Sequence, residues 1–409
     1  MTPLDGIVAR NRAGQAVGLP SYCTAHPETL AAILRCYRDD DAPVLIEATC
    51  NQVNPSGGYT GLTPAAFRRL VEGIAGAQGV APGRLILGGD HLGPNPWKAD
   101  RAEVAMDRAR AMVAAYVQAG FTKLHLDASM ACADDGVLAQ EVMADRTADL
   151  AAVAEAAGGG PLRYVIGTEV PVPGGETGPV TGLAVTRPGA VRRTLDLHRA
   201  AFAARGLSGV MDRVVAVVVQ PGVDFGNDQV VVFDPAQAAA LCDAAPGLGG
   251  PLYEAHSTDY QDGAALAALV AGHFPLLKVG PELTFAFRQA VFALADIAGQ
   301  RGALEAALRD AMRADPADWR AYVDADRQEA TMMLYGLSDR VRYYWPRHGV
   351  RQAVDRLFAQ VRASTPARGV VAQATGGLVG PVDPQRLPEA VTGRMVGAVV
   401  AKYRNATGG

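Results

Sequence analysis

Polar residues that could bind a metal stand at the ends of several short apolar runs in this chain. Each of these residues follows a different run, so each would come from a different strand. Nitrogen and oxygen donors that converge from separate strands, with one position left open for a substrate, are the pattern of a catalytic metal site. The set that we predict to hold one divalent metal is His91, Glu169, Gln220 and His256.

Other polar residues near the ends of the runs are candidates for moving protons or for binding a substrate. The carboxylates predicted to move protons are Asp90, Asp127 and Glu176. The residues predicted to contact the substrate are His26, Glu47, Gln52, Asp259, Lys278 and Glu282. One polar residue at the end of a strand is more often structural than functional, but their recurrence after nearly every run indicates a single clustered site.

The elements that must position these residues alternate regularly along the chain. Eight short apolar runs, from 19–25 to 275–280, are separated by amphipathic stretches with helical periodicity. Runs that are apolar throughout are typical of strands buried on both faces of a parallel sheet. Eight such units predict an α/β protein with a (β/α)8 TIM barrel. A doubly wound sheet is the alternative, but no GxGxxG motif opens the first unit.

We expect two parts in the chain: the barrel over residues 1–300, and a C-terminal helical extension over residues 301–409 that packs on the barrel. Within the barrel, we expect His125 to lie in the wall rather than in the site. Within the extension, we interpret the segment SDRVRYYWP at 338–346 as an interface or core segment. Its arginines, Arg340 and Arg342, could alternatively reach over the barrel mouth.

The composition argues against several classes of protein. The net charge is −4, with 20% charged and 49% hydrophobic residues, which favours a globular protein without affinity for nucleic acid. No uncharged apolar run is long enough for a membrane helix, and the first residues do not have the pattern of a signal peptide. The 5 cysteines form no CxxC pair. These features predict a cytoplasmic protein with free thiols.

Longer motifs of the sequence resemble a known family. The motifs LIEATCNQVNPSGGYTG, LGGDHLGPNPW, VIGTEVPVPGGE, EAHSTDYQ and SDRVRYYWP resemble, in this order, segments of the tagatose-bisphosphate aldolase accessory-subunit family (GatZ/KbaZ-like). The resemblance runs from about residue 19 to 346 and is weak after about residue 360. It implies either a subunit that supports a class II aldolase or an epimerase of tagatose, fructose or tagaturonate.

The same family is a distant relative of the class II aldolases, and that resemblance implies roles for individual residues. Asp90 resembles their acid/base aspartate, and His91, Glu169 and His256 resemble metal-binding residues. Gln220 stands where those enzymes carry a further histidine, so manganese, nickel and cobalt remain open beside zinc.

Two further differences from the class II aldolases concern the substrate. Asp259 stands where those enzymes bind phosphate with glycine amides, and Glu282 follows a proline at the eighth strand. Carboxylates at these positions would repel a phosphate. They predict an unphosphorylated sugar.

Three functions follow from these observations. The favoured one is a metal-dependent epimerase of an unphosphorylated ketohexose, which inverts C4 by breaking and remaking the C3–C4 bond. The alternatives are a non-catalytic subunit of a class II tagatose-bisphosphate aldolase and a true aldolase. The predicted partners are the sugar, further copies of the chain in a homo-oligomer and, in the subunit alternative, an aldolase catalytic subunit.

Overall fold

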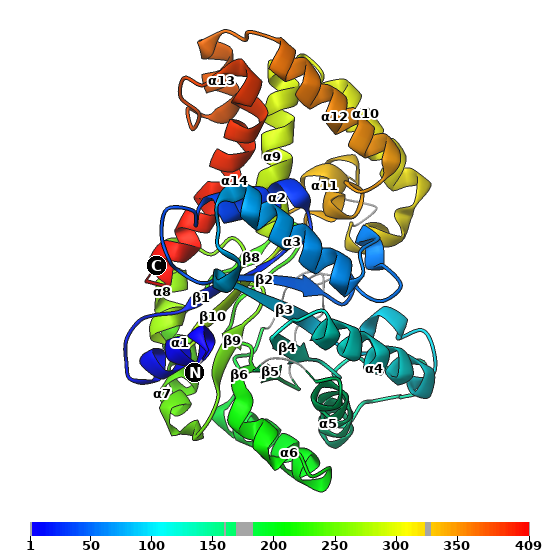
Figure 1. Ribbon diagram of the computed structural model, residues 1–409, viewed down its shortest axis with the longest axis vertical. Helices are drawn as coiled ribbons and strands as arrows, with labels where there is room; N and C mark the ends of the chain where they lie inside the picture. Colours follow the sequence, from blue (N-terminus) through cyan, green and yellow to red (C-terminus); the bar gives the residue numbers. More distant parts are fainter. Residues whose placement is uncertain (1, 159–160, 169–182, 324–328, 409) are drawn as a thin grey trace.

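Eight parallel strands close into a barrel in the computed structural model, which describes residues 2–158, 161–168, 183–323 and 329–408 (Figure 1). The order around the barrel is β1-β10-β9-β6-β5-β4-β3-β2, so the prediction of a TIM barrel is confirmed. The strands are β1 (Leu19–Cys23), β2 (Val44–Thr49), β3 (Leu85–Leu92), β4 (Lys123–Leu126), β5 (Arg163–Ile166), β6 (Val214–Val218), β9 (Leu252–Ala255) and β10 (Leu276–Val279).

Helices follow the strands and cover the outside of the barrel (Figure 1). They are α2 (Pro27–Arg35), α3 (Pro64–Gln78), α4 (Ala102–Gln118), α5 (Gln140–Ala156), α6 (Pro188–Ala204), α7 (Pro235–Ala244), α8 (Gly263–Ala271) and α9 (Pro281–Ile297). Several begin with proline, which is favoured in the first helical turn because that turn needs no backbone N–H donor. A further helix that the apolar pattern did not reveal, α1 (Pro3–Arg12), precedes β1. Its Asp5 forms an ion pair with Arg163 at the start of β5.

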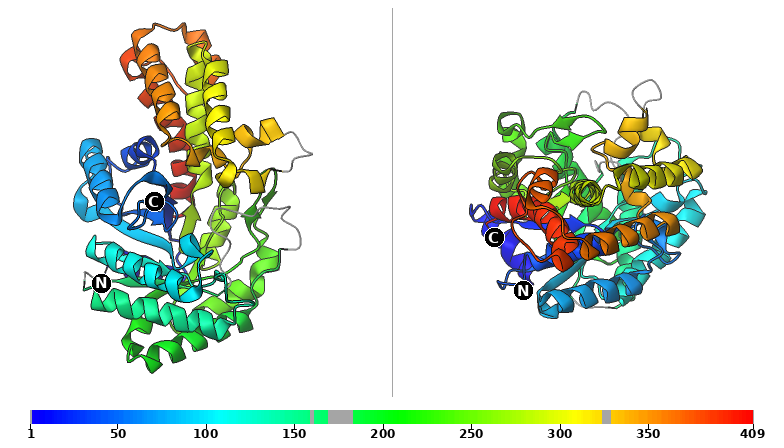
Figure 2. Two further views of the ribbon diagram at one scale, coloured as in Figure 1. Left: turned by 90° about the vertical axis from the view of Figure 1, so that its right-hand side faces the viewer. Right: turned by 90° about the horizontal axis from the view of Figure 1, so that it is seen from above.

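The C-terminal extension rises from the barrel as a bundle of long helices (Figure 2). Its helices are α10 (Arg301–Ala314), α11 (Glu329–Tyr335), α12 (His348–Ala363), α13 (Arg368–Thr375) and α14 (Leu387–Ala406). Helix α9 runs from the barrel into this bundle, and α14 returns from the tip to pack against α2, α8 and α9 (Figures 1 and 2). The predicted division near residue 300 falls between α9 and α10, and we retain it as a proposal.

The extension is tied to the carboxyl ends of two barrel strands. The Tyr403 hydroxyl on α14 donates to the Thr258 carbonyl oxygen, 2.7 Å away, in the loop after β9. Next to it, Lys402 forms an ion pair with Glu282 in the first turn of α9. Because barrel active sites lie at the carboxyl ends of strands, α14 buttresses the face on which a site is expected.

A second part of the extension lies at the barrel mouth. A short hairpin of β7 (Asp224–Phe225) and β8 (Val230–Val231) follows β6, and Asn227 lies in its turn. The Leu337 amide donates to the Asn227 carbonyl oxygen over 2.8 Å, and the Ser338 hydroxyl donates to the Asn227 side-chain oxygen over 2.6 Å. The segment that begins at Ser338 is thereby anchored next to the strand ends.

No described helix is long and apolar enough to cross a membrane.

Candidate active site

The end of β3 is shaped by glycines that let other parts of the chain approach closely. A Cβ atom on Gly88 would lie 2.4 Å from the Glu47 carboxylate, and one on Gly93 would lie 1.6 Å from the Asp127 carbonyl oxygen. Between these glycines the register of β3 with β4 shifts, and His91 takes a left-handed backbone with a φ of 49°. Such strain in a non-glycine residue is concentrated at functional sites, where the surrounding structure sustains it.

Four buried side chains converge beside His91. Their ligand atoms all lie within 4.8 Å of one another, and they are Asp90, His125, Glu254 and His256. The His91 ring lies 5.0 Å from the His125 ring and 4.9 Å from the His256 ring, measured between centroids. Nitrogen and carboxylate donors that come from three different strands at this spacing could hold a divalent metal.

Two of these histidines carry nitrogen atoms without a hydrogen-bond partner. Burial lowers the pKa of both His125 and His256, so that both rings are neutral at neutral pH. The Nε2 atom of His125 and the Nδ1 atom of His256 are buried and contact no donor or acceptor within the described ranges. Leaving buried polar atoms unpaired is costly, and a metal ion would satisfy such lone pairs. The residues present therefore fit a metal.

A charged network supports the histidines from below. Lys123 is 0% exposed and lies between two carboxylates that are also fully buried, with its Nζ atom 2.6 Å from Glu47 and 2.8 Å from Glu254. The other Glu254 oxygen lies 3.0 Å from Nε2 of His256 and accepts a hydrogen bond from that nitrogen. This hydrogen bond selects the tautomer of His256 in which Nδ1 has a free lone pair.

Asp127 plays a comparable role for His91. One Asp127 oxygen lies 2.8 Å from Nδ1 of His91, and the other accepts hydrogen bonds from the amide and the hydroxyl of Ser129. Although burial raises it, these hydrogen bonds, that with His91 above all, hold the pKa of Asp127 well below its usual value. Asp127 is thus a fixed carboxylate that orients His91, which suits it poorly to the predicted role of moving protons.

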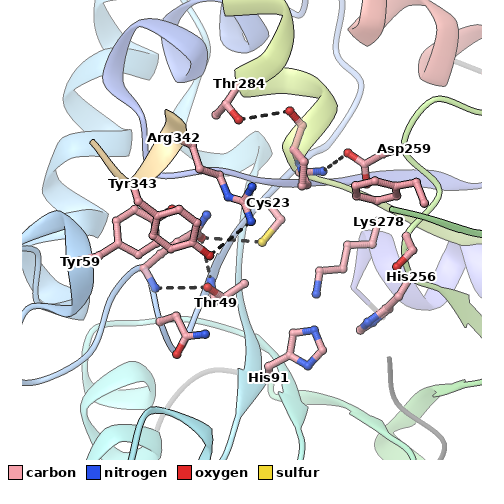
Figure 3. Close-up of a pocket in the computed structure, with 16 residues that line it drawn as sticks. Cys23, Thr49, Tyr59, His91, His256, Asp259, Lys278, Thr284, Arg342 and Tyr343 are labelled. Carbon is pink, nitrogen blue, oxygen red and sulfur yellow. Dashed lines mark hydrogen bonds between the residues drawn. The ribbon is translucent and has the colours of Figure 1, made fainter. Parts of the chain in front are cut away.

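The pocket above this cluster brings together residues from the barrel and from the extension (Figure 3). Gln52, Asp259 and Lys278, which the sequence predicted to contact the substrate, all line it. Lys278 also contacts Asp90 through an ion pair, so a proton donor and a carboxylate meet next to the histidines. Arg342 and Tyr343 line the same pocket from the short helical turn Arg340–Tyr343. The structural interpretation of SDRVRYYWP therefore holds only in part: Val341 and Tyr344 are buried, but Arg342 does reach the mouth.

Several predicted residues lie elsewhere or outside the described residues. Gln220 uses its side-chain oxygen to accept the amides of Gly222 and Val223, at 2.8 and 2.9 Å, and so it caps the loop after β6 instead of joining the cluster. Glu169 and Glu176 fall outside the described residues.

Three of the predicted substrate contacts also need correction, because their side chains are engaged away from this pocket. His26 packs against Phe287, 4.2 Å between ring centroids, in a neighbouring cavity. Glu47 lies below the site on Lys123, and Glu282 accepts the Tyr260 amide and pairs with Lys402.

Sequence reasoning placed His125 in the barrel wall and left out Glu254, yet both belong to the cluster. A signal was present for Glu254, because a carboxylate two residues before His256 on one strand points to the same side of the sheet. For His125, the strand KLHL is buried along its whole length, so no alternation of polar and apolar residues indicated which side faces the interior.

Asp259 is held against the first turn of α9. One of its oxygens accepts the amides of Gly280 and Glu282, at 3.0 and 2.8 Å. Burial, together with the charge of Glu282, raises the pKa of Asp259 from 3.8 to about 7 despite these two hydrogen bonds. The folded protein therefore binds this proton more tightly than the unfolded chain does.

The raised pKa predicts a loss of stability as the pH rises. The tighter binding of this proton adds fully to the free energy of unfolding below the unfolded pKa near 4. That stabilisation is lost as the pH rises through about 7. Asp259→Asn removes the titration while its oxygen can still accept both amides. Between pH 5 and pH 8 the variant is expected to gain stability relative to the wild type, by up to about 3 kcal/mol, because about two pH units separate pH 5 from the folded pKa.

Denaturant unfolding of both proteins at the two pH values measures this difference. Asp262→Asn is the matched control, since Asp262 is an exposed helix cap that accepts the Ala265 amide. A stability difference for Asp259→Asn that stays constant from pH 5 to pH 8 would contradict the prediction.

The chain matches a known protein family over nearly its whole length. The profile of the family described as D-tagatose-1,6-bisphosphate aldolase subunit GatZ/KbaZ-like matches residues 4–408. The chain belongs to this family. The resemblance predicted from the motifs is confirmed, and it extends through the C-terminal region, where the motifs alone were weak.

Individual members of the GatZ/KbaZ-like family carry different names. D-tagatose 6-phosphate 4-epimerase of Agrobacterium fabrum is 46% identical, over 99% of this chain and 98% of that protein. D-tagatose-1,6-bisphosphate aldolase subunit GatZ of Salmonella dublin is 45% identical, over 94% of this chain and 92% of that protein. A crystal structure from Sinorhizobium meliloti 1021, described as a probable tagatose 6 phosphate kinase, has a TM-score of 0.85 at 44% identity and covers 95% of this chain and 100% of that chain. Membership in the GatZ/KbaZ-like family therefore does not by itself select the reaction.

Proposed function

We propose that this protein is a carbohydrate epimerase that inverts C4 of a tagatose- or fructose-type ketohexose with the help of one divalent metal. The observation that carries the proposal is the convergence of neutral histidines with the Asp90–Lys278 pair inside one pocket. The relative from Agrobacterium fabrum, 46% identical over nearly the whole chain, is named for the same class of reaction.

The residues that would hold the metal are His125, Glu254 and His256, with His91 beside them, and Asp90 of the same cluster is assigned to proton transfer. This set replaces the ligands predicted from the sequence except His256, and Glu169 remains a candidate outside the described residues. Mixed nitrogen and oxygen donors leave manganese, nickel, cobalt and zinc open. Bound there, the cation would act as a Lewis acid on the ketone and the neighbouring hydroxyl group of the sugar.

The chain's own residues would move the proton of the C4 hydroxyl group. Asp90 lies 2.9 Å from Nδ1 of His125 and forms an ion pair with Lys278, so its carboxylate is held in place from two sides. Burial lowers the pKa of Lys278, which makes its ammonium a better proton donor. Asp90 would take the proton when C3–C4 breaks. Lys278 would return one after the aldehyde half has turned over, and Asp90 would then pass its proton to the Lys278 amine, which restores the ion pair. Glu176 is the alternative donor, in which case Asp90 would release its proton to solvent and Glu176 would regain one from it.

Asp259 and Glu282 do not present free charges to a substrate, as the prediction of an unphosphorylated sugar required. Asp259 is bound to two backbone amides and Glu282 to Lys402. We therefore propose that the ketohexose carries an anionic group, as in the substrate named for the Agrobacterium relative. The free sugar remains the second candidate, because the Asp259 carboxylate occupies amides at a helix start that could otherwise bind a phosphate.

The subunit role remains the main alternative function, since relatives are named as aldolase subunits. A purely structural subunit would have no use for two unpartnered histidine nitrogens beside a carboxylate–lysine pair. A true aldolase would use the same residues but would release the aldehyde before re-addition. A kinase is disfavoured, because the glycines of GGDHLGPN are not followed by the lysine of a phosphate-binding loop.

One experiment separates these functions. The purified protein alone is incubated with tagatose 6-phosphate, fructose 6-phosphate, tagatose, fructose, tagaturonate and tagatose 1,6-bisphosphate, with and without Mn²⁺, Ni²⁺, Co²⁺ or Zn²⁺. We expect interconversion of C4 epimers only with metal. Release of trioses would indicate an aldolase, and no turnover with any metal would refute the proposal in favour of the subunit role.

A further inference from the structure

Arg342 is the feature of the pocket that the proposed reaction does not use. Its side chain is 8% exposed and lines the pocket next to Tyr59 and Tyr343 (Figure 3). Its Nη1 atom donates to the carbonyl oxygens of Ser338 and Asp339, and its Nη2 atom donates to the Tyr343 hydroxyl over 3.3 Å. These contacts hold the guanidinium in one place without neutralising it.

No carboxylate forms an ion pair with Arg342 in the part of the chain that the structure describes. The nearest acidic side chain in sequence, Asp339, is already engaged: one of its oxygens lies 3.3 Å from Arg288, and the other accepts the Thr284 hydroxyl over 2.5 Å. A buried cation without a counterion is costly, unless an anion binds next to it. The Nε–H and one Nη2 hydrogen of Arg342 have no partner among the described residues, and a guanidinium can offer two such donors to two oxygens of an anion.

The other charged groups on the pocket wall are already matched. Lys278 is paired with Asp90, and Asp259 is bound to the amides of Gly280 and Glu282. Among the described wall residues, the charge of Arg342 is therefore the one that remains to be balanced.

The position of Arg342 fits the far end of a ketohexose. In the close-up, His91, His256 and the Lys278 amine gather on one side of the pocket, and Arg342 with Tyr343 lies on the other (Figure 3). If the bond next to C4 reacts beside the histidines and Lys278, the chain from C5 to C6 has to point away from them. We propose that Arg342, supplied by the C-terminal extension, binds an anionic group on C6 of the substrate.

This inference rests on the proposed function for the identity of the sugar. A phosphate and a carboxylate offer a guanidinium the same pair of oxygens, so the shared chemistry is a C6 anion. If Arg342 binds this anion, the preference for anionic over neutral sugars depends on a residue of the C-terminal extension and not on the barrel. The rings of Tyr59 and Tyr343 pack beside Arg342, with their centroids 4.4 Å apart and their planes inclined at 47°.

The test compares the wild type with Arg342→Gln and Arg342→Lys. Arg347→Gln is the matched control, because Arg347 is an exposed arginine in an ion pair with Asp315. The kcat/KM is measured for tagatose 6-phosphate, tagaturonate and tagatose. For whichever anionic sugar the wild type accepts, Arg342→Gln is expected to lower kcat/KM about 100-fold, while activity on tagatose stays within about threefold. Arg342→Lys is expected to recover part of the loss, since it keeps the charge but not the paired donors.

Equal losses on anionic and neutral sugars in Arg342→Gln would overturn the inference, as would no loss on the anionic sugar. If the wild type turns over no sugar at all, the proposed function fails, and calorimetric binding of tagatose 6-phosphate then decides the inference separately. Weaker binding by Arg342→Gln than by wild type and Arg347→Gln would support it, and equal binding would refute it. Should Arg342→Gln not fold, Arg342→Lys is compared with the wild type in the same assays.

Discussion

His256→Ala is expected to abolish metal-dependent turnover and to lower the bound metal measured by elemental analysis. The imidazole is buried and neutral, its Nε2 atom is held by Glu254, and its Nδ1 atom has no hydrogen-bond partner among the described residues. Its removal deletes a ligand and leaves the Glu254 oxygen without its partner. Since a bound cation supplies several kcal/mol of transition-state stabilisation, kcat/KM should fall by at least about 1,000-fold.

The control for this variant is His348→Ala, since His348 is an exposed residue at the start of α12. It should keep both the metal and the activity. Unchanged metal content in His256→Ala would contradict the ligand assignment, whatever happens to the activity.

A second pair of variants distinguishes the ligand set of the structure from that of the sequence. His125→Ala should lose metal, because His125 is one of the four converging residues and its buried Nε2 atom has no hydrogen-bond partner in the described ranges. Gln220→Ala should keep metal and lose only the loop cap on Gly222 and Val223. The reverse outcome would restore the ligand set predicted from the sequence.

Lys123→Met is expected to cause the largest loss of stability of any single replacement in the site. The lysine is enclosed by the carboxylates of Glu47 and Glu254. Although burial lowers it, these two carboxylates hold the pKa of Lys123 above its usual value, so it is charged. Its removal leaves two buried negative charges facing each other, and breaking such a pair costs about 3–5 kcal/mol of unfolding free energy.

Denaturant unfolding of Lys123→Met measures this loss. The matched control is Lys402→Met, which removes the partly exposed ion pair with Glu282 and should cost about 1 kcal/mol or less. Replacing Glu47 and Glu254 by glutamine in the Lys123→Met background should recover part of the stability, because no unpaired charge then remains. A loss no larger than that of Lys402→Met would contradict the assignment.

The barrel and the face that carries the site could be predicted from the sequence alone. Runs that are apolar throughout, separated by amphipathic stretches, leave few arrangements other than parallel strands enclosed by helices. In such a barrel the carboxyl ends of all strands meet on one face, so Asp90, His91 and His256 were expected to lie together. This prediction needs only chain order and strand direction, which are local properties.

The roles within that face were decided by the tertiary structure. The strand KLHL is buried along its whole length, so the sequence contains no alternation to show that His125 belongs to the cluster. Glu47, the partner of Lys123 on β2, is 76 residues away in the sequence, and only the folding of the barrel brings the two side chains together. The Gln220 side chain could ligate a metal, but in the structure its oxygen accepts a hydrogen bond from the nearby Gly222 amide.

The sequence by itself determined the fold, the family and the face of the barrel on which the candidate site lies. These follow from hydrophobic periodicity and from motifs that are contiguous in the chain. The tertiary structure decided which donors converge, and it placed Arg342 from the extension on the wall of a barrel pocket. The reason is physical: side-chain direction, ion pairing and contact between distant segments depend on packing, and the linear order of residues does not encode packing locally.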